Sequence, residues 1–117
     1  MGQFIEKYRV EKIDAPEMLR LAFDIRHRVF VDEQGVPAEE ELDEFESIAR
    51  HFLAFDEGGK AIGTARWRKT DAGYKLERFA VLKEYRKMGI GGILVETVKN
   101  DVLRHDPEAK MYLHAQV

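Results

Sequence analysis

The chain of 117 residues contains no cysteine. Disulfide bonds, thiolate catalysis and thiolate-bound zinc are therefore excluded together. Histidine offers no substitute, because no two of the four histidines stand three to five residues apart, the spacing that brings ligands to one metal ion. The sequence predicts no metal site.

Long apolar runs are also missing. No stretch approaches the roughly 20 residues that cross a bilayer, and the N-terminal segment lacks the apolar core of a signal peptide. Excess positive charge is absent as well, since 19 basic residues are outnumbered by 22 acidic ones and the net charge is −3. We therefore expect a cytoplasmic protein that binds neither membrane nor nucleic acid.

The composition instead indicates one globular domain over residues 1–117, with 44% hydrophobic and 35% charged residues. Alternating apolar and charged residues around Tyr8 predict a first strand with one side in water. Two further strands, at 51–55 and 61–68, flank a glycine pair and predict a hairpin. A turn then leads into a third antiparallel strand near Leu76.

A helix is predicted between the first strand and the hairpin. Asp14 and Glu17 have the spacing of a capping box, and Pro16 suits the first turn. Apolar residues then recur at helical spacing through about Phe30 and predict a buried stripe; they are Met18, Ala22, Ile25 and Val29.

An acidic run follows this helix; it consists of Glu39, Glu40, Glu41, Asp43, Glu44 and Glu46. One interpretation is a solvated helix face or a mobile loop. The other is a surface patch that attracts a cationic amine substrate. A calcium loop is excluded, because the required order of aspartates and glycine is missing.

The stretch from residue 76 to 98 carries the strongest functional signal, since it has the pattern of a strand, a tight turn and a helix N-terminus. Three glycines stand within four positions ahead of an amphipathic helix; they are Gly89, Gly91 and Gly92. Uncovered amides and the helix dipole favour an anion there, and Arg86 and Lys87 add positive charge. The stretch predicts a binding site for the phosphates of a cofactor.

The helix after these glycines must end before Pro107, because the residue before a proline is biased away from helix. Residues 111–117 have the pattern of a final strand. A strand, a helix and a strand form a crossover unit, so the last two strands are predicted to be parallel.

Two other phosphate-binding patterns fail. The Walker pattern requires Ser or Thr after Gly-Lys, but Gly59 and Lys60 are followed by Ala61. The dinucleotide fingerprint requires a glycine where Leu94 stands. The pattern that remains is Arg-x-x-Gly-x-Gly at 86–91, extended by Gly92.

This pattern, with the strand before it, resembles the acetyl-coenzyme A signature of the GCN5-related N-acetyltransferases (GNAT). Residues 26–31 and 33–37, and His51 at the start of the next strand, are similar to the small bacterial ElaA-like and YjcF-like branch. The resemblance implies the α/β acetyltransferase fold, a mixed sheet with N-terminal antiparallel strands and a splayed parallel pair around the glycine loop. It also implies transfer of an acetyl group from acetyl-coenzyme A to an amine of a small molecule or peptide, by direct attack.

The resemblance assigns roles to residues as well. The pyrophosphate would lie on the loop formed by Arg86, Lys87, Met88, Gly89, Ile90, Gly91 and Gly92. The pantetheine arm and the thioester would lie along Phe79, Ala80 and Val81. Contacts to the acceptor are expected from Arg26, Arg28 and Gln34, together with the acidic run.

An amine that attacks a thioester must lose a proton, which a carboxylate can accept. Glu77 lies on the strand beside the expected thioester and is the candidate base. The alternative is a strand glutamate paired with Arg66 or Arg68 across the hairpin. A backbone N–H near Val81 is implied to stabilise negative charge on the thioester oxygen.

Members of the family continue past the last strand into a helix whose tyrosine protonates the departing thiolate, and then into two more strands. No such segment follows here, so we expect a C-terminally truncated form, with an open strand edge that a homodimer would cover. A coenzyme A-binding module with little or no turnover is the alternative function. An acyl-homoserine lactone synthase-like enzyme is a third, which the glycine loop and the short acidic chain disfavour.

Overall fold

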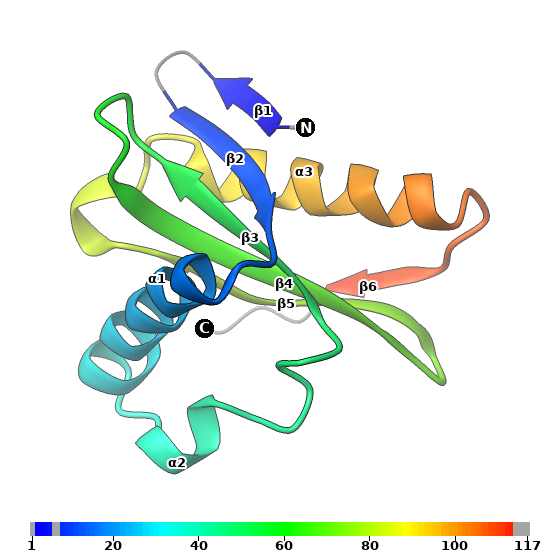
Figure 1. Cartoon of the computed structure of the whole chain (residues 1–117), viewed down its shortest axis with the longest axis horizontal. Coiled ribbons are helices and arrows are strands. Elements are labelled where there is room, and N and C mark those ends of the chain that lie inside the picture. Colours follow the sequence, from blue (N-terminus) through cyan, green and yellow to red (C-terminus); the bar gives the residue numbers. More distant parts are fainter. Residues whose placement is uncertain (1, 6–7, 114–117) are drawn as a thin grey trace.

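The computed structural model describes residues 2–5 and 8–113, which form one six-stranded sheet with helices on both faces (Figure 1). The strands are β1 (Gly2–Ile5), β2 (Tyr8–Ile13), β3 (Arg50–Phe55), β4 (Ala61–Thr70), β5 (Gly73–Val81) and β6 (Met111–Leu113). The helices are α1 (Pro16–Arg26), α2 (Ala38–Glu41) and α3 (Ile90–His105). Among these residues no helix is long and apolar enough to cross a membrane.

The strands lie in the sheet in the order of the sequence, from β1 at one edge to β6 at the other. Neighbours from β1 to β5 are antiparallel, and β5 and β6 are parallel. The predicted hairpin, third antiparallel strand and parallel final pair are confirmed. Strand β1 was not predicted, and the expected continuation of β6 to residue 117 lies outside the described residues.

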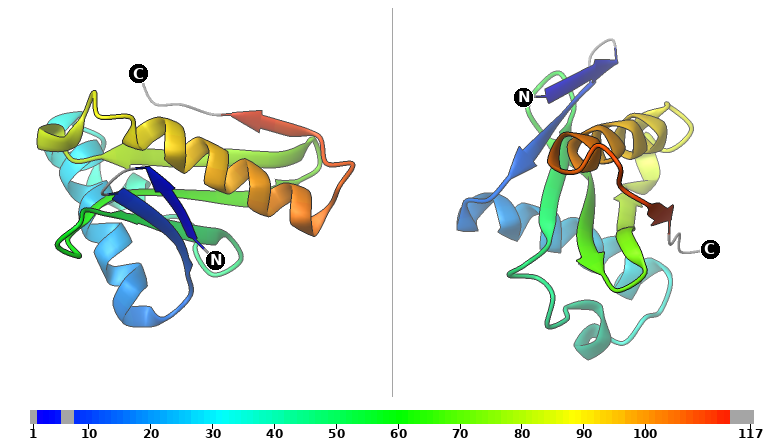
Figure 2. Two further views of the ribbon diagram at one scale, coloured as in Figure 1. Left: turned by 90° about the horizontal axis from the view of Figure 1, so that it is seen from above. Right: turned by 90° about the vertical axis from the view of Figure 1, so that its right-hand side faces the viewer.

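Alternation along the strands divides the core between the two faces of the sheet. Phe52 of β3 packs in the layer beneath α3, whereas its neighbour Leu53 packs in the layer beneath α1. Figure 2 shows α1 and α3 on opposite sides of the sheet. The π-helical segment that follows α1, His27–Glu33, contacts β5.

Helix α1 begins at Pro16, one residue later than Asp14 as the N-cap predicts, so the capping box is wrong. Ala15 occupies the N-cap position in an extended conformation, and no side chain caps the helix. The reason is Pro16 itself, which biases the preceding residue to extended geometry and so leaves Asp14 one position too early. The buried stripe is confirmed, and it continues through a π-helical segment, His27–Glu33, that buries Val29 and Phe30.

Strand β6 pairs with β5 along a short register, from Tyr74 opposite Met111 to Leu76 opposite Leu113. Beyond Leu76, that edge of β5 has no partner strand among residues 2–5 and 8–113. The other edge of β6 is likewise unpaired within this part of the chain. The expectation that a homodimer covers it stays a prediction.

Candidate active site

Strand β5 is interrupted by a β-bulge. Ala65 of β4 faces two residues of β5, Arg78 and Phe79, because its neighbours Thr64 and Arg66 pair with Ala80 and Glu77. Arg78 has a φ of 58°, a left-handed conformation that strains any residue other than glycine. The bulge lets Glu77 and Arg78 both reach charged partners on the face covered by α1 and α2. Bulges and strained backbone gather at functional sites, which marks this part of β5.

The edge of β5 that follows the bulge has no partner strand in the described part of the chain. The N–H of Leu82 donates to the carbonyl of Ile62 next to β4 at 2.9 Å, so its neighbour Val81 faces the opposite edge. The Val81 carbonyl accepts a bond from Nε of Arg86 at 3.0 Å, as this orientation requires. Ala80, opposite Thr64 of β4, has its side chain buried beneath α1.

The glycine loop leaves the first turn of α3 open. Gly89 has a φ of 83° and caps the helix, a conformation that requires glycine. Gly91 and Gly92 are helical, and a Cβ added at either would meet nothing within 4 Å. Packing therefore does not explain why these two residues lack side chains, whereas a bulky ligand lying against the turn would.

The amides of this turn are available to such a ligand. The N–H of Ile93 is the first to bond within the helix, to the carbonyl of Gly89 at 3.1 Å. Those of Ile90, Gly91 and Gly92 find no acceptor in the described part of the chain. The Ile90 side chain is buried and anchors the loop. An anionic diphosphate fits this arrangement of free amides, helix dipole and open space.

Two of the predicted phosphate ligands differ in their surroundings. Lys87 is exposed, whereas Arg86 is engaged by the protein itself. Its terminal nitrogens donate to both carboxylate oxygens of Glu33, at 2.7 and 2.5 Å. Met88 is exposed, and its sulfur accepts a hydrogen bond from Tyr8 at 3.2 Å.

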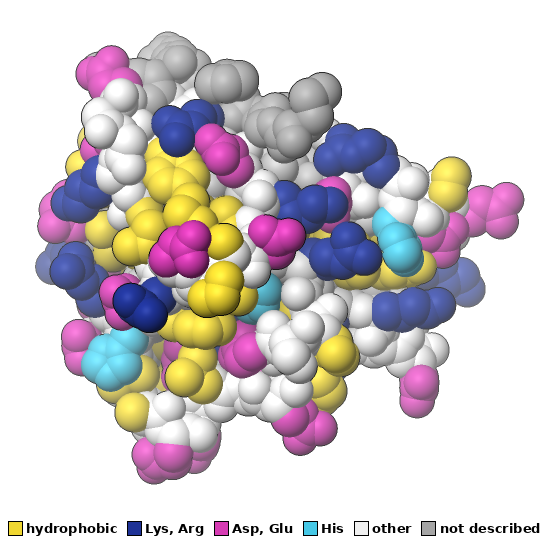
Figure 3. Space-filling view, viewed as in Figure 1, with side chains coloured by type: hydrophobic (Ala, Val, Ile, Leu, Met, Phe, Trp, Pro, Cys, Tyr) yellow, Lys and Arg dark blue, Asp and Glu magenta, His cyan; other side chains and the backbone are white. Residues whose placement is uncertain are grey.

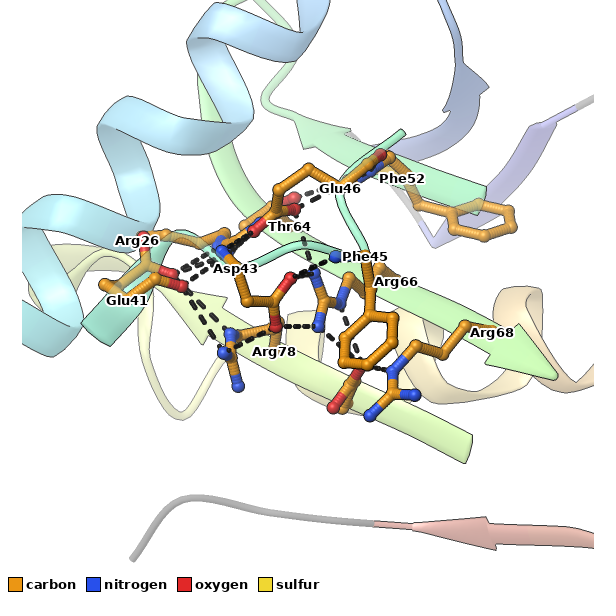
Figure 4. A network of polar contacts seen from close by, with 12 residues as sticks. Arg26, Glu41, Asp43, Phe45, Glu46, Phe52, Thr64, Arg66, Arg68 and Arg78 are labelled. Carbon is orange, nitrogen blue, oxygen red and sulfur yellow. Dashed lines mark hydrogen bonds and ion pairs between the residues drawn. The ribbon is translucent and has the colours of Figure 1, made fainter. Parts of the chain in front are cut away.

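Behind β5 lies a buried network of arginines and carboxylates (Figure 4). Arg26 is 1% exposed, and all three of its nitrogens donate to Glu41 or Glu46 at 2.7–2.9 Å. These bonds leave no nitrogen of Arg26 for the acceptor substrate, although the resemblance implied such a contact. Arg28 and Gln34 are exposed, and their contacts with an acceptor stay a prediction.

The acidic run supplies the carboxylates of this network, which neither interpretation of the run anticipated. Glu41 is buried, and Asp43 and Glu46 are partly buried against arginines. Acidic side chains that remain outside are dispersed among other types over the face shown in Figure 3. Half of the run is therefore an internal counterion for arginines, whereas Glu39, Glu40 and Glu44 are exposed.

Glu77 lies on β5, among the basic residues that β4 and β5 contribute to this network, and is only 2% exposed. Its Oε2 accepts from Nε of Arg66 at 2.9 Å and from Nε of Arg68 at 2.7 Å, and Lys75 lies 3.4 Å from Oε1. Burial acts to raise the pKa of Glu77, but the bond from Arg68 and the charge of Arg66 outweigh it and hold this pKa below its ordinary value. The arrangement favours the cross-hairpin ion pair over a free base.

Sequence reasoning did not select the arginines as a set. Arg66 and Arg68 alternate along one strand with period two, which places both side chains on one face, opposite Glu77. This spacing in the sequence already indicates that Arg66 and Arg68 share one face of the sheet. Arg78 carried none, since only the bulge turns its side chain to the same face. No group of histidine, aspartate and glutamate side chains within residues 2–5 and 8–113 has the arrangement of a metal site.

Known proteins are similar to this chain in sequence. The model of the acetyltransferase (GNAT) family matches residues 16–117. The uncharacterized N-acetyltransferase YjcF of Bacillus subtilis is 48% identical over 83 residues, which cover 71% of this chain. The match spans 59% of the length of YjcF.

Two solved structures share the fold. ElaA of Escherichia coli superposes with a TM-score of 0.80 at 22% identity, covering 100% of this chain and 80% of that one. An acyl-CoA N-acyltransferase from Pseudomonas aeruginosa also gives 0.80 at 22% identity, covering 93% and 78%. At this level of identity the likeness concerns the fold.

Proposed function

Because this chain belongs to the acetyltransferase (GNAT) family, we propose that it transfers an acetyl group from acetyl-coenzyme A to a primary amine of a small molecule or peptide. The observation that carries the proposal is the open first turn of α3. The fold leaves room for a Cβ atom at Gly91 and at Gly92, so packing does not require glycine at either position. The amides beside them lack acceptors in the described part of the chain. A diphosphate uses both properties.

The chain's own groups divide the work of binding. The amides of residues 90–92 and the exposed Lys87 hold the phosphates, and the main chain of Phe79 and Val81 pairs with the pantetheine arm along the free edge of β5. Acetyl-coenzyme A, when bound, would supply a thioester: the amine attacks its acyl carbon directly, the carbon–sulfur bond breaks, and coenzyme A leaves as the thiol after its sulfur takes up a proton. The N–H of Val81 faces the same edge and is placed to donate to the thioester oxygen.

Proton removal from the amine is assigned to Glu77, directly or through water. Arg66 and Arg68 keep its carboxylate ionised at neutral pH, which is the form that accepts a proton. The same ion pairs lower its affinity for that proton. They favour the second candidate function, a coenzyme A-binding module with little or no turnover.

Thermal unfolding with and without acetyl-coenzyme A tests the binding step. A ligand at about 100 times its dissociation constant stabilises a protein by about 2.7 kcal/mol, so a clear rise in Tm is expected. Release of free thiol in the presence of a panel of amines then separates transfer from binding alone. No rise in Tm at millimolar ligand would remove both candidate functions.

A further inference from the structure

The buried network on β5 has more positive than negative groups, and both Arg78 and Asp43 reach its partly exposed rim. Its cations are Arg26, Arg66, Arg68, Arg78 and Lys75, and its carboxylates are those of Glu41, Asp43, Glu46 and Glu77. Arg26 and Arg66, each 1% exposed, take up most of the carboxylate oxygens. Arg68 and Arg78, 14% and 16% exposed, form the outer rim.

Arg68 is held in place with its binding edge unused. Nε donates to Glu77, and the Phe45 ring lies 3.8 Å from the guanidinium carbon and covers one face. The two terminal nitrogens have no hydrogen-bond partner in the described part of the chain. Neither of them is fully buried. A guanidinium restrained in this way loses little freedom when it binds a carboxylate or phosphate.

Arg78 shows two signs of an incomplete site. Its backbone is strained at φ 58°, and its Nε, which lies 3.5 Å from Oε2 of Glu41, is the one buried side-chain nitrogen that lacks a hydrogen-bond partner within the described residues. Nη2 donates weakly to the Glu41 carbonyl at 3.3 Å and to Asp43 at 3.1 Å. Figure 4 shows the outer nitrogens of Arg68 and Arg78 on the same side of the network, away from α1.

We propose that Arg68 and Arg78 bind an acidic group of the acceptor, so that the amine substrate of this protein also carries a carboxylate or a phosphate. The inference rests on the proposed function for the transfer itself, but the binding of the acidic group needs no coenzyme A. Arg78 lies in the bulge, directly before the part of β5 whose edge is free and where the thioester is expected, and Arg68 lies on the neighbouring strand β4 opposite Lys75. An acidic group on these arginines would orient the amine towards that edge.

The test is a titration of the ¹⁵N-labelled chain followed at the Nε–H signals of arginine. Three probes are compared: alanylalanine, its C-terminal amide, and 2-aminoethyl phosphate. We expect the acidic dipeptide to move the Arg68 and Arg78 signals and to bind at least about tenfold more tightly than the amide. The phosphate probe is compared with alanylalanine, which carries a carboxylate. The probe that binds more tightly shows whether the acceptor carries a phosphate or a carboxylate.

Arg68→Gln is expected to abolish the preference for acid over amide, and Arg68→Lys to retain only part of it, because lysine lacks the fork. Arg104→Gln, on the exposed end of α3, is the matched control and should keep the full preference. Equal binding of all three probes, or arginine signals that no acidic probe moves, would overturn the proposal. Coenzyme A titrated into the same sample reports separately on the proposed function, so the two can fail independently.

Discussion

The carboxylate of Glu33 meets the guanidinium of Arg86 with both oxygens, at 2.7 and 2.5 Å. The pair joins the end of the π-helical segment to the loop that precedes α3, and both side chains lie at the surface. Arg86 also donates from Nε to the Val81 carbonyl, so each of its nitrogens has an acceptor. Glu33 thus binds the guanidinium group that, by the resemblance, would bind the pyrophosphate.

The first prediction concerns this competition. Glu33→Gln removes the carboxylate that a diphosphate must displace from Arg86, so binding of coenzyme A is expected to tighten at least about threefold. The change in Tm without ligand should be small, because the pair is exposed to solvent. Isothermal titration measures the affinity, and Asp32→Asn on the neighbouring exposed residue is the control. Weaker binding would mean that the pair instead holds the loop in its binding geometry.

The second prediction concerns the open turn of α3. Gly91→Leu should fold, because its Cβ meets nothing within 4 Å, yet lose the rise in Tm with coenzyme A, because the side chain fills the space of the diphosphate. Gly58→Leu, in the turn between β3 and β4, is the control, since its Cβ makes only an ordinary contact with Asp56. An unchanged rise in Gly91→Leu would place the phosphates elsewhere.

The third prediction separates the two roles of Glu77. Glu77→Gln leaves Arg66 and Arg68 short of a buried counterion, so unfolding in urea is expected to show a loss of about 2–3 kcal/mol. Glu96→Gln, on an exposed position of α3, should change little.

The same variant tests the base assignment through its pH–rate profile. If Glu77 accepts the proton, Glu77→Gln lowers the maximal rate and changes the shape of the profile. A profile and maximal rate that match the unmodified chain would end that assignment and leave Glu77 as an ion-pair residue.

The fourth prediction is a loss of stability in acid. Burial opposes ionisation of Asp43, Glu46 and Glu77, but hydrogen bonds from arginines outweigh it and hold the pKa of each carboxyl below its ordinary value. Groups with a lowered pKa in the folded state stabilise fully above their unfolded pKa of about 4, and this stabilisation is lost as the pH falls below it. Urea unfolding at pH 7, 5 and 3 should show little change to pH 5 and a marked fall at pH 3. A constant free energy of unfolding would contradict the assignment of these ion pairs.

Much of the fold was legible in the sequence because its signals are local. The hairpin around the glycine pair, the stripe from Ala22 to Phe30 and the end of α3 before Pro107 each depend on neighbouring residues. The glycine loop was equally legible, since the conformation of Gly89 and the open turn after it follow from a few consecutive residues.

The partners of the charged residues required the tertiary structure. Arg26 finds Glu41 across 15 positions, Arg66 finds Asp43 across 23, and Arg78 finds the same aspartate across 35. No periodicity links such positions, and an acidic run has the same pattern whether water or arginine surrounds it. The bulge at Arg78 is also a property of paired strands, because it exists only where two residues of β5 face one of β4. The sequence by itself determined most of the secondary elements and the glycine loop, whereas only chain packing decided which charges are buried in ion pairs and which arginines remain at the rim.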